Sequence, residues 1–298
     1  MFELSGASLK DMTCAYGGDC LNTALYFNRL TGGCNCYFVT AIGRDPLSKI
    51  MLSQWQAENL NCSCVLVDEL RHSGIYSVSV DTSGERNFHY WRKESAATNL
   101  LKHPGFSEVC KALNTMDVVY VSGISLAILS NADRQRLLEI LSLLHDQGVR
   151  LIVDSNYRPA LWENVETARH CMKPLLALAE VALVTFQDEV QLWGDRSVEE
   201  CNQRIRSLGV RTVVIKSGQH GVYSGEGNNE MDLIEAPTVD RVVDTTAAGD
   251  SFNAGFLAKY FANQNVAEAC RYGSSVAAQV IGHQGAIVPA KEFVIPEI

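Results

Sequence analysis

The sequence predicts an α/β fold: a mostly parallel central sheet with helices on both faces and a small β lid. Two observations carry this prediction. Along the middle of the chain, short apolar runs that end in small or polar residues alternate with amphipathic, helix-like stretches. Residues 73–92 instead have the alternation of an antiparallel hairpin. Strand–helix alternation favours a parallel sheet whose ligands gather at the carboxyl ends of the strands.

The first candidate element is a helix that opens with a glycine-rich turn. The stretch GGDCLN, residues 17–22, puts two glycines and a carboxylate directly before the amphipathic run that continues to residue 30. Side chains at such a turn lie close to any ligand at the helix start. Asp19 and Asn22 could therefore bind the hydroxyls of a sugar.

The hairpin at 73–92 has one aromatic face. Side chains alternate between the two faces of a strand. The residues that share faces are Phe88, Tyr90 and Arg92 on one strand, and Tyr76, Val78 and Val80 on the other. An aromatic face that carries an Arg suits a lid over a polar, anionic ligand. An ordinary hairpin whose aromatic side chains pack on the core is the alternative interpretation.

Four apolar runs predict strands buried on both faces. They are residues 117–123, 149–156, 181–186 and 211–218. The segment 131–148 between the first two predicts a helix, with Asn131 as its N-cap, a leucine stripe over 137–144 and Gly148 at its end. The polar stretches DSNYR (154–158) and KSGQHG (216–221) then fall at the ends of strands, where ligands of such sheets bind.

The stretch DTTAAGD, residues 244–250, also precedes a helical pattern. Apolar residues recur at helical spacing from Phe252 onward. The turn thus lies at a helix N-terminus, where unpaired N–H groups and the helix dipole bind anions and small residues let a phosphate approach. Asp250 could accept the proton of an attacking hydroxyl there. A simple cap at Asp250 with close packing of the small residues is the alternative.

Composition narrows the partners. The 298 residues include 25 Lys and Arg against 34 Asp and Glu, a net charge of −9, so nucleic acid is not an expected partner. No run approaches the roughly 18 apolar residues of a membrane helix, and the start lacks the build of a signal peptide. No segment resembles an interdomain linker. We therefore expect a cytoplasmic protein without a membrane partner, folded as one domain over 1–298.

The ten cysteines are predicted to be free thiols, because reducing compartments keep thiols unpaired. Cys34 and Cys36, with Cys62 and Cys64, form two C-x-C pairs that could meet at a zinc ion. Structural zinc sites usually have wider spacing between paired ligands. Small, partly buried strand residues are therefore the favoured interpretation.

Taken together, these motifs resemble the ribokinase-like (PfkB) carbohydrate kinases. DTTAAGDSFNAGFLA is similar to the C-terminal signature of that family and GGDCLNTALYFNRL to its N-terminal one, and the resemblance covers nearly the whole chain in order. GGDCLN, HYWR, SGISLAILS, DSNYRPALW and DTTAAGD together most resemble the branch that acts on 2-keto-3-deoxygluconate. The resemblance implies ATP-dependent phosphorylation of the terminal hydroxyl of 2-keto-3-deoxy-D-gluconate, giving 2-keto-3-deoxy-6-phosphogluconate, within a ribokinase-like fold.

The resemblance also implies a role for each motif residue. Asp250 would be the catalytic base, and Ala247, Ala248 and Gly249 would form the anion hole. The residues implied for the sugar acid are Gly18, Asp19, Cys20, Leu21, Asn22, Tyr76, Tyr90, Trp91, Arg92, Arg158 and Asp250. Those implied for ATP are Asn156, Arg158, Lys216, Ser217, Gly218, Gly221, Ala247, Ala248 and Gly249.

Metal and assembly follow from the same resemblance. Mg²⁺ would bridge the ATP phosphates largely through water, and a monovalent cation could bind near Asp244 and Thr246. Lid strands near 11–18 and 72–92 would form a homodimer contact. Residues 1–6 would belong to the first central strand. The N-x-x-E motif that the family ties to Mg²⁺ matches only loosely, as Thr185 and Asp188, so no metal ligand is assigned.

Three alternatives stay open. One is a fructokinase or another ketose kinase of the family, which the Arg-bearing lid disfavours. The second is a sugar-binding member without catalysis, which the intact Gly249 and Asp250 disfavour. The third is a hydrolase with Ser125 in GISLA as nucleophile, which Ala127 disfavours because the usual elbow has Gly there. Labelling of Ser125 with a fluorophosphonate probe would distinguish the hydrolase.

Overall fold

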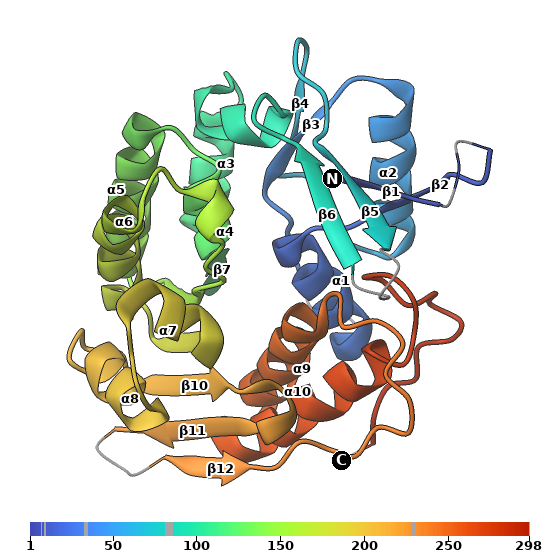
Figure 1. Cartoon of the computed structure of the whole chain (residues 1–298). Coiled ribbons are helices and arrows are strands. Elements are labelled where there is room, and N and C mark those ends of the chain that lie inside the picture. The colour runs from blue at the N-terminus through green and yellow to red at the C-terminus, as the bar shows by residue number, and fades with distance from the viewer. Residues whose placement is uncertain (7, 9, 33–34, 81–85, 228–230, 298) are drawn as a thin grey trace.

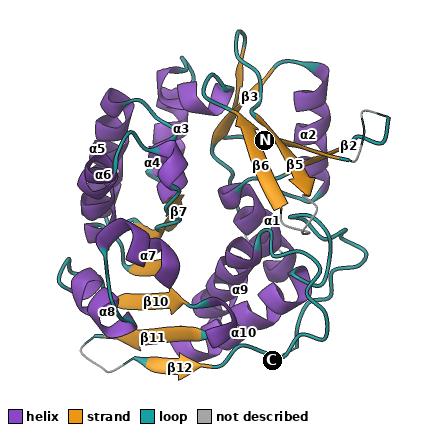
Figure 2. Ribbon diagram, in the orientation of Figure 1, coloured by secondary structure: helices purple, strands orange, loops and turns teal. Residues whose placement is uncertain are grey.

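Two sheets of different size organise the chain, and the computed structural model describes residues 1–6, 8, 10–32, 35–80, 86–227 and 231–297 of it (Figures 1 and 2). The larger sheet has six strands in the order β12-β11-β10-β9-β8-β7, and the smaller has four in the order β2-β1-β5-β6. A further pair, β3 (Thr40–Gly43) and β4 (Val65–Asp68), is parallel.

The parallel part of the larger sheet confirms the four predicted strands. It consists of β7 (Val118–Ser122), β8 (Arg150–Asp154), β9 (Val181–Thr185) and β10 (Thr212–Lys216). The antiparallel strands β11 (Val222–Glu226) and β12 (Asp232–Ile234) extend it at one edge. The polar ends of the parallel strands therefore meet along one edge of the sheet.

Each parallel strand is buried on both faces. On β8, Leu151 and Val153 pack into one core, while Ile152 between them faces a second core. The helices over the first core are α4 (Gly123–Ala127), α5 (Asn131–Asp146), α6 (Val165–Ala177), α7 (Phe186–Trp193) and α8 (Val198–Arg206). Those over the second are α9 (Ala248–Asn263) and α10 (Val266–Val280). The predicted fold class is confirmed.

Helix α5 corrects one detail of the prediction. Its N-cap is Ser130, whose hydroxyl accepts the N–H of Asp133, so the expectation of an Asn131 cap is wrong. Asn131 is instead the first helical residue, and its side chain accepts a hydrogen bond from Arg134. The leucine stripe and the left-handed Gly148 after the helix are as predicted.

The smaller sheet contains the predicted hairpin. Its strands are β1 (Phe2–Ser5), β2 (Thr13–Tyr16), β5 (Ile75–Val80) and β6 (Arg86–Trp91). β5 and β6 are antiparallel, with Tyr76 opposite Tyr90. Residues 81–85 of the predicted turn lie outside the described residues. The expectation that residues 1–6 belong to the central sheet is wrong, because β1 lies between β2 and β5.

Helix α1 (Asp19–Thr31) connects the two parts of the molecule. It begins directly after β2 of the small sheet and packs along α9, as Figure 1 shows with the small sheet drawn above both helices. The outlying helices α2 (Pro46–Ala57) and α3 (Phe106–Leu113) complete the fold. The N-termini of α1 and α9, which carry the two glycine-containing motifs, are thereby brought together.

Two expectations about composition can be compared with the structure. Among the described helices, none is both long and apolar enough to cross a bilayer. The nine described cysteines are all free thiols, and Cys34 lies outside the described residues. Within the described part of the chain, Cys36, Cys62 and Cys64 do not form a cluster of metal ligands.

Candidate active site

Helix α9 begins at the predicted anion-binding turn. Ala247, directly before it, has a left-handed backbone with φ 61°, a conformation that suits glycine better than alanine. The Ala248 N–H donates to the Thr245 carbonyl at 3.2 Å. The following amides, of Gly249 and Asp250, belong to the first turn, whose N–H groups have no carbonyl partner within the helix. This helix start can therefore hold an anion.

Asp250 connects the starts of α9 and α1. Its Oδ2 accepts the Asn22 side-chain N–H at 2.8 Å, and its backbone carbonyl accepts the Thr23 hydroxyl at 3.2 Å. Burial, followed by the negative charge of Asp19, raises the pKa of Asp250 to about 7. A carboxylate with that pKa is a better proton acceptor near neutral pH than an ordinary aspartate.

Asp19, the first residue of α1, lies beside this carboxylate. Its Oδ2 accepts the side-chain N–H of Asn156 at 3.4 Å. Burial raises the pKa of Asp19, while hydrogen bonds from the Ser122 hydroxyl and the Cys20 N–H act against the shift. The Cys20 thiol lies 3.7 Å from the Ser125 hydroxyl. Thus residues from the predicted sugar-binding turn meet the ends of β7 and β8.

The small sheet adds an aromatic face next to this turn. The rings of Tyr76 and Tyr90 lie with centroids 5.9 Å apart, and the Arg92 guanidinium lies 4.2 Å from the centroid of Tyr90. The Tyr76 hydroxyl donates to Glu3. It also lies so close to Gly17 that a Cβ there would come within 2.9 Å of it. Burial lowers the pKa of Arg92, and Asp19 acts in the opposite direction.

Two predicted sugar residues are not brought to this group by their side chains. Trp91 points to the opposite face of β6 from Tyr90 and is 61% exposed. Leu21 is 2% exposed and packs in the core with Phe2 and Leu25. Strand alternation excludes Trp91 from the face of Tyr90 and Arg92, so the tetrapeptide HYWR cannot present all its side chains to one ligand.

Of the residues predicted for the nucleotide, Lys216 contacts α9 directly. Lys216 ends β10, and its Nζ lies 2.9 Å from Asn253 Oδ1. The loop after it is closed by the Ser217 N–H, which donates to the Gly221 carbonyl at 2.9 Å. Gly221 has φ 94°, and a Cβ there would overlap the Ile234 carbonyl, so the position requires glycine. Gly218 is also left-handed.

Arg158 and Asn156 lie at the end of β8. The Arg158 guanidinium pairs with Asp188 at 3.1 Å and its side chain is 51% exposed. Burial raises the pKa of Asp188 and the Arg158 charge lowers it. Asn156 has the uncommon φ of 33° and is buried next to Asp19. Asp188 therefore neutralises part of the Arg158 charge, and the exposed part of the guanidinium can still reach an anion.

Sequence reasoning missed three polar residues of this region. Tyr120 on β7, Asp154 on β8 and Asn253 on α9 form hydrogen bonds with one another behind Lys216. Two of them stand inside quoted motifs, Asp154 in DSNYR and Asn253 in GDSFN. A polar residue one turn after Asp250 in an otherwise apolar helix was the available signal.

No separate metal cage is present among the described residues. Glu189, Asp195 and Cys201 lie close together, but the Arg204 guanidinium already contacts all three. Asp188 pairs with Arg158, as described above. Asp244 accepts hydrogen bonds from the Thr246 N–H and hydroxyl and from the Gly285 N–H. The acidic side chains near the site thus have partners within the protein.

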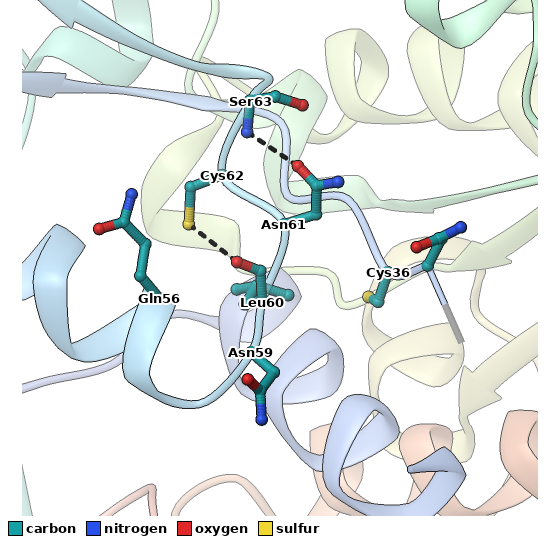
Figure 3. A pocket seen from close by; sticks show the side chains of 8 residues that line it. Cys36, Gln56, Asn59, Leu60, Asn61, Cys62 and Ser63 are labelled. Carbon is teal, nitrogen blue, oxygen red and sulfur yellow. Dashed lines mark hydrogen bonds between the residues drawn. The ribbon is translucent and has the colours of Figure 1, made fainter. Parts of the chain in front are cut away.

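A hollow of about 570 Å³ lies elsewhere, between the end of α2 and the segment before β4. Figure 3 shows the amide side chains around it, and an Asn61 side chain that accepts the Ser63 N–H at 3.0 Å. Its lining residues are Asn35, Cys36, Gln56, Asn59, Leu60, Asn61, Cys62 and Ser63. None of the predicted site residues lines it, and it holds no charged side chain.

Known proteins match the chain over nearly its whole length. The family profile described as pfkB family carbohydrate kinase matches residues 3–292. The 2-dehydro-3-deoxygluconokinase of Haemophilus influenzae is 42% identical over 97% of this chain and 93% of its own length. That of Escherichia coli K12 is 38% identical over 97% and 94%. The crystal structure of a PfkB protein from Polaromonas sp. JS666 has a TM-score of 0.81 at 23% identity, covering 98% of this chain and 95% of that one.

Proposed function

Since this chain belongs to the pfkB family of carbohydrate kinases, we propose that it phosphorylates 2-keto-3-deoxy-D-gluconate (2-dehydro-3-deoxygluconate) at its terminal hydroxyl with ATP. The observation that carries the proposal is Asp250, a carboxylate with a pKa near 7 in the first turn of a helix whose amides can hold a phosphate. Relatives named 2-dehydro-3-deoxygluconokinase, 38–42% identical over nearly the full length, support the choice of sugar.

The chemistry follows from the positions of these groups. Asp250 takes the proton from the sugar hydroxyl as the oxygen attacks the terminal phosphorus of ATP, and ADP leaves on the opposite side. The α9 amides at Gly249 and Asp250 stabilise the charge on the phosphoryl oxygens. Ala248, which was expected to share this role, already donates its N–H to the Thr245 carbonyl. Asn22 holds Asp250 through its 2.8 Å hydrogen bond, so the base keeps its orientation between proton transfers.

The aromatic face of the small sheet supports an acidic substrate. Tyr76 and Tyr90 would cover the sugar, and Arg92 would bind its carboxylate with the two-pronged geometry that Lys lacks. A fructokinase would have no need of this cation, because its ketose is neutral. In this proposal the small sheet acts as a lid that excludes water during transfer.

The nucleotide would lie along Lys216, Ser217, Gly218 and Gly221, with Asn156 and Arg158 near its phosphates. The bound Mg²⁺ would supply charge neutralisation of those phosphates. In this proposal the ion is held by the phosphates and water and not by a carboxylate cage of the protein. A monovalent cation near Asp244 and Thr246 belongs to the same proposal, supported by the buried carboxylate of Asp244.

The proposal extends to the whole protein. We take residues 1–298 as one kinase domain that works in the cytoplasm and forms a homodimer through the small sheet. Support for the dimer comes from Trp91, which is 61% exposed on the face of β6 that points away from Tyr90 and the sugar.

The experiment that tests the function is an ATP-coupled turnover assay on five sugars side by side. They are 2-keto-3-deoxygluconate, its galactose-derived epimer, fructose, ribose and fructose 6-phosphate. We expect the highest kcat/KM for one of the two ketodeoxy acids, with the gluconate form preferred. A higher value for a neutral ketose would replace the substrate but keep the kinase, and binding of a sugar without turnover of any would favour a non-catalytic sugar-binding protein.

A further inference from the structure

A buried polar cluster lies directly behind the start of α9, and the chemistry described above uses only its lysine. It consists of Tyr120, Asp154, Asn253 and Lys216. Asn253 is 0%, Asp154 3% and Lys216 7% exposed, so their polar groups depend on one another for hydrogen bonds. Buried ionic groups are costly unless they are paired, which makes the geometry of this cluster informative.

Hydrogen bonds fix the orientation of the Asn253 amide. Its Nδ2 donates to Asp154 Oδ2 at 2.9 Å and to the Tyr120 hydroxyl at 3.0 Å. The Tyr120 hydroxyl in turn donates to the same Asp154 oxygen at 3.3 Å. Both amide N–H groups are therefore used, and Oδ1 faces Lys216. A flipped amide would set its NH₂ group against the ammonium, with two donors facing each other.

Lys216 forms only a loose ion pair with Asp154. Its Nζ lies 2.9 Å from the uncharged Asn253 Oδ1 but 3.5 Å from Asp154 Oδ1. Charged N–H···O hydrogen bonds to carboxylates are normally about 2.7–2.9 Å long, so the contact with Asp154 is a loose one. The uncharged Asn253 amide therefore makes the short contact with Nζ that a carboxylate would make in a tight ion pair.

The ammonium also lies next to the anion-binding turn. A Cβ built on Gly249 would be 3.8 Å from Lys216 Nζ, which places the cation beside the first turn of α9. The turn already carries negative charge, since Asp19 and Asp154 both act on Asp250 as like charges. A phosphate arriving there needs a cation to offset them.

We propose that Asn253 is a positioning residue: fixed by Tyr120 and Asp154, its carbonyl keeps the Lys216 ammonium beside Gly249, available to the transferred phosphate. Without the amide, Lys216 would close onto Asp154 as a tight ion pair and withdraw from the turn. The inference rests on the proposed kinase function and adds to it an arrangement that keeps one buried cation only loosely paired with its carboxylate.

The test is a double-mutant cycle with Asn253→Leu and Lys216→Met. If Asn253 acts through Lys216, Asn253→Leu lowers kcat by about 30-fold or more and raises the KM for ATP several-fold, while the KM for the sugar stays within about threefold. In the Lys216→Met background the same change costs less than about threefold. Additive losses in the two backgrounds would overturn the proposal, because a purely structural role does not depend on the lysine.

Two further variants serve as a substitute for Asn253→Leu and as its control. Tyr120→Phe removes one hydrogen-bond partner of the Asn253 amide, and it replaces Asn253→Leu in the cycle if that variant fails to fold. We expect it to lower kcat by roughly 3–10-fold, and we expect this loss to disappear in the Lys216→Met background. Asn202→Leu is the matched control, a buried asparagine on α8 that accepts a hydrogen bond from Arg206. A loss of kcat in this control equal to that of Asn253→Leu would show that any buried amide matters and would overturn the proposal.

Failure of the kinase assignment gives a different result. If the unmodified protein phosphorylates none of the sugars, the proposed function fails, and the cycle is then measured as the Kd of MgATP by calorimetry. Non-additive weakening of MgATP binding would still support the inference about Lys216. Additive weakening, or none, would overturn it.

Discussion

Asp250 is the residue on which the proposed reaction depends, and its substitution separates chemistry from binding. Asp250→Asn keeps the shape of the side chain and an acceptor for the Asn22 hydrogen bond. It removes the base, so we expect kcat to fall by about 100-fold or more while the Kd values of sugar and ATP change by no more than a few fold. Steady-state kinetics and calorimetry on the same preparation measure both quantities.

The matched control for this loss is Asp146→Asn, which removes an exposed carboxylate at the end of α5. Turnover of the control should equal that of the unmodified protein. Near-normal turnover of Asp250→Asn would remove Asp250 as the base and direct attention to Asp19, the other carboxylate of the site.

The pKa of Asp250 predicts a pH dependence whose sign can be worked out. The base acts in its ionised form, so kcat/KM should rise with pH through about 7 and then level off. Because the charge of Asp19 contributes to this high pKa, Asp19→Asn should move the rising limb to lower pH, even though it also weakens sugar binding. The comparison is a kcat/KM profile from pH 5 to 9 for both proteins. An unmoved limb would show that Asp250 does not titrate in the rate-limiting proton transfer.

In the proposed function, the side chains at the end of strand β6 and directly after it select the sugar. Arg92→Ala removes the cation that lies against Tyr90, and we expect it to raise the KM of the ketodeoxy acid by about tenfold or more with a smaller effect on fructose. The measurement is the ratio of the two KM values. Arg44→Ala, which removes an exposed arginine paired with Glu69, should leave that ratio unchanged. Equal effects of Arg92→Ala on both sugars would refute the carboxylate assignment.

Helices α9 and α10 cross at two glycines, and this crossing sets the position of the anion-binding turn. A Cβ on Gly255 would come 2.8 Å from the Gly273 Cα and 2.9 Å from the Val276 side chain. In an open helix position, Gly→Ala stabilises by about 1 kcal/mol, whereas overpacking costs about 1–3 kcal/mol. We expect the overpacking cost to exceed the gain, so Gly255→Ala should lower the free energy of unfolding by up to about 2 kcal/mol. Urea denaturation measures it.

Gly282→Ala is the comparison for that crossing, because a Cβ there meets nothing closer than 3.3 Å. It should change stability by clearly less than Gly255→Ala. If Gly255→Ala proves neutral or stabilising, the two helices must be able to move apart, and the turn at Ala247 would not be fixed by their contact.

Local signals in the sequence were enough for the parallel strands of the larger sheet, but not for β11 and β12 at its edge. Continuous apolar runs identified β7 to β10, and the helical spacing after Asp250 located the start of α9. The position of β1 could not be predicted in the same way, because Phe2–Ser5 pairs in parallel with Ile75–Val78, more than 70 residues away. Pairing between distant strands depends on contacts that no short pattern records.

The sequence allowed the motifs of the site to be predicted, but not the contacts between them. The turns at 17–22 and 244–250 were expected to be near a sugar and a phosphate, but the hydrogen bond between them, from Asn22 to Asp250, joins residues 228 positions apart. The Asn253–Asp154 contact likewise joins a helix to a strand 99 positions earlier. Trp91 shows the opposite error, since strand alternation alone would have excluded it from the face of Tyr90.

The assembly of the whole molecule is the last property that the structure makes testable. Trp91 is 61% exposed on the face of β6 that points away from Tyr90 and Arg92, so its substitution can separate assembly from substrate binding. If the small sheets of two chains pack together, Trp91→Glu places a charge in an apolar contact and should shift the protein from dimer to monomer. Sedimentation velocity measures the mass, and Leu143→Glu, which alters an equally exposed leucine (60%) on α5, is the control. A Trp91→Glu protein that remains dimeric would place the interface away from this face. An unmodified protein that sediments as a monomer would refute the proposed dimer, and each small sheet would then cover its site without a partner chain.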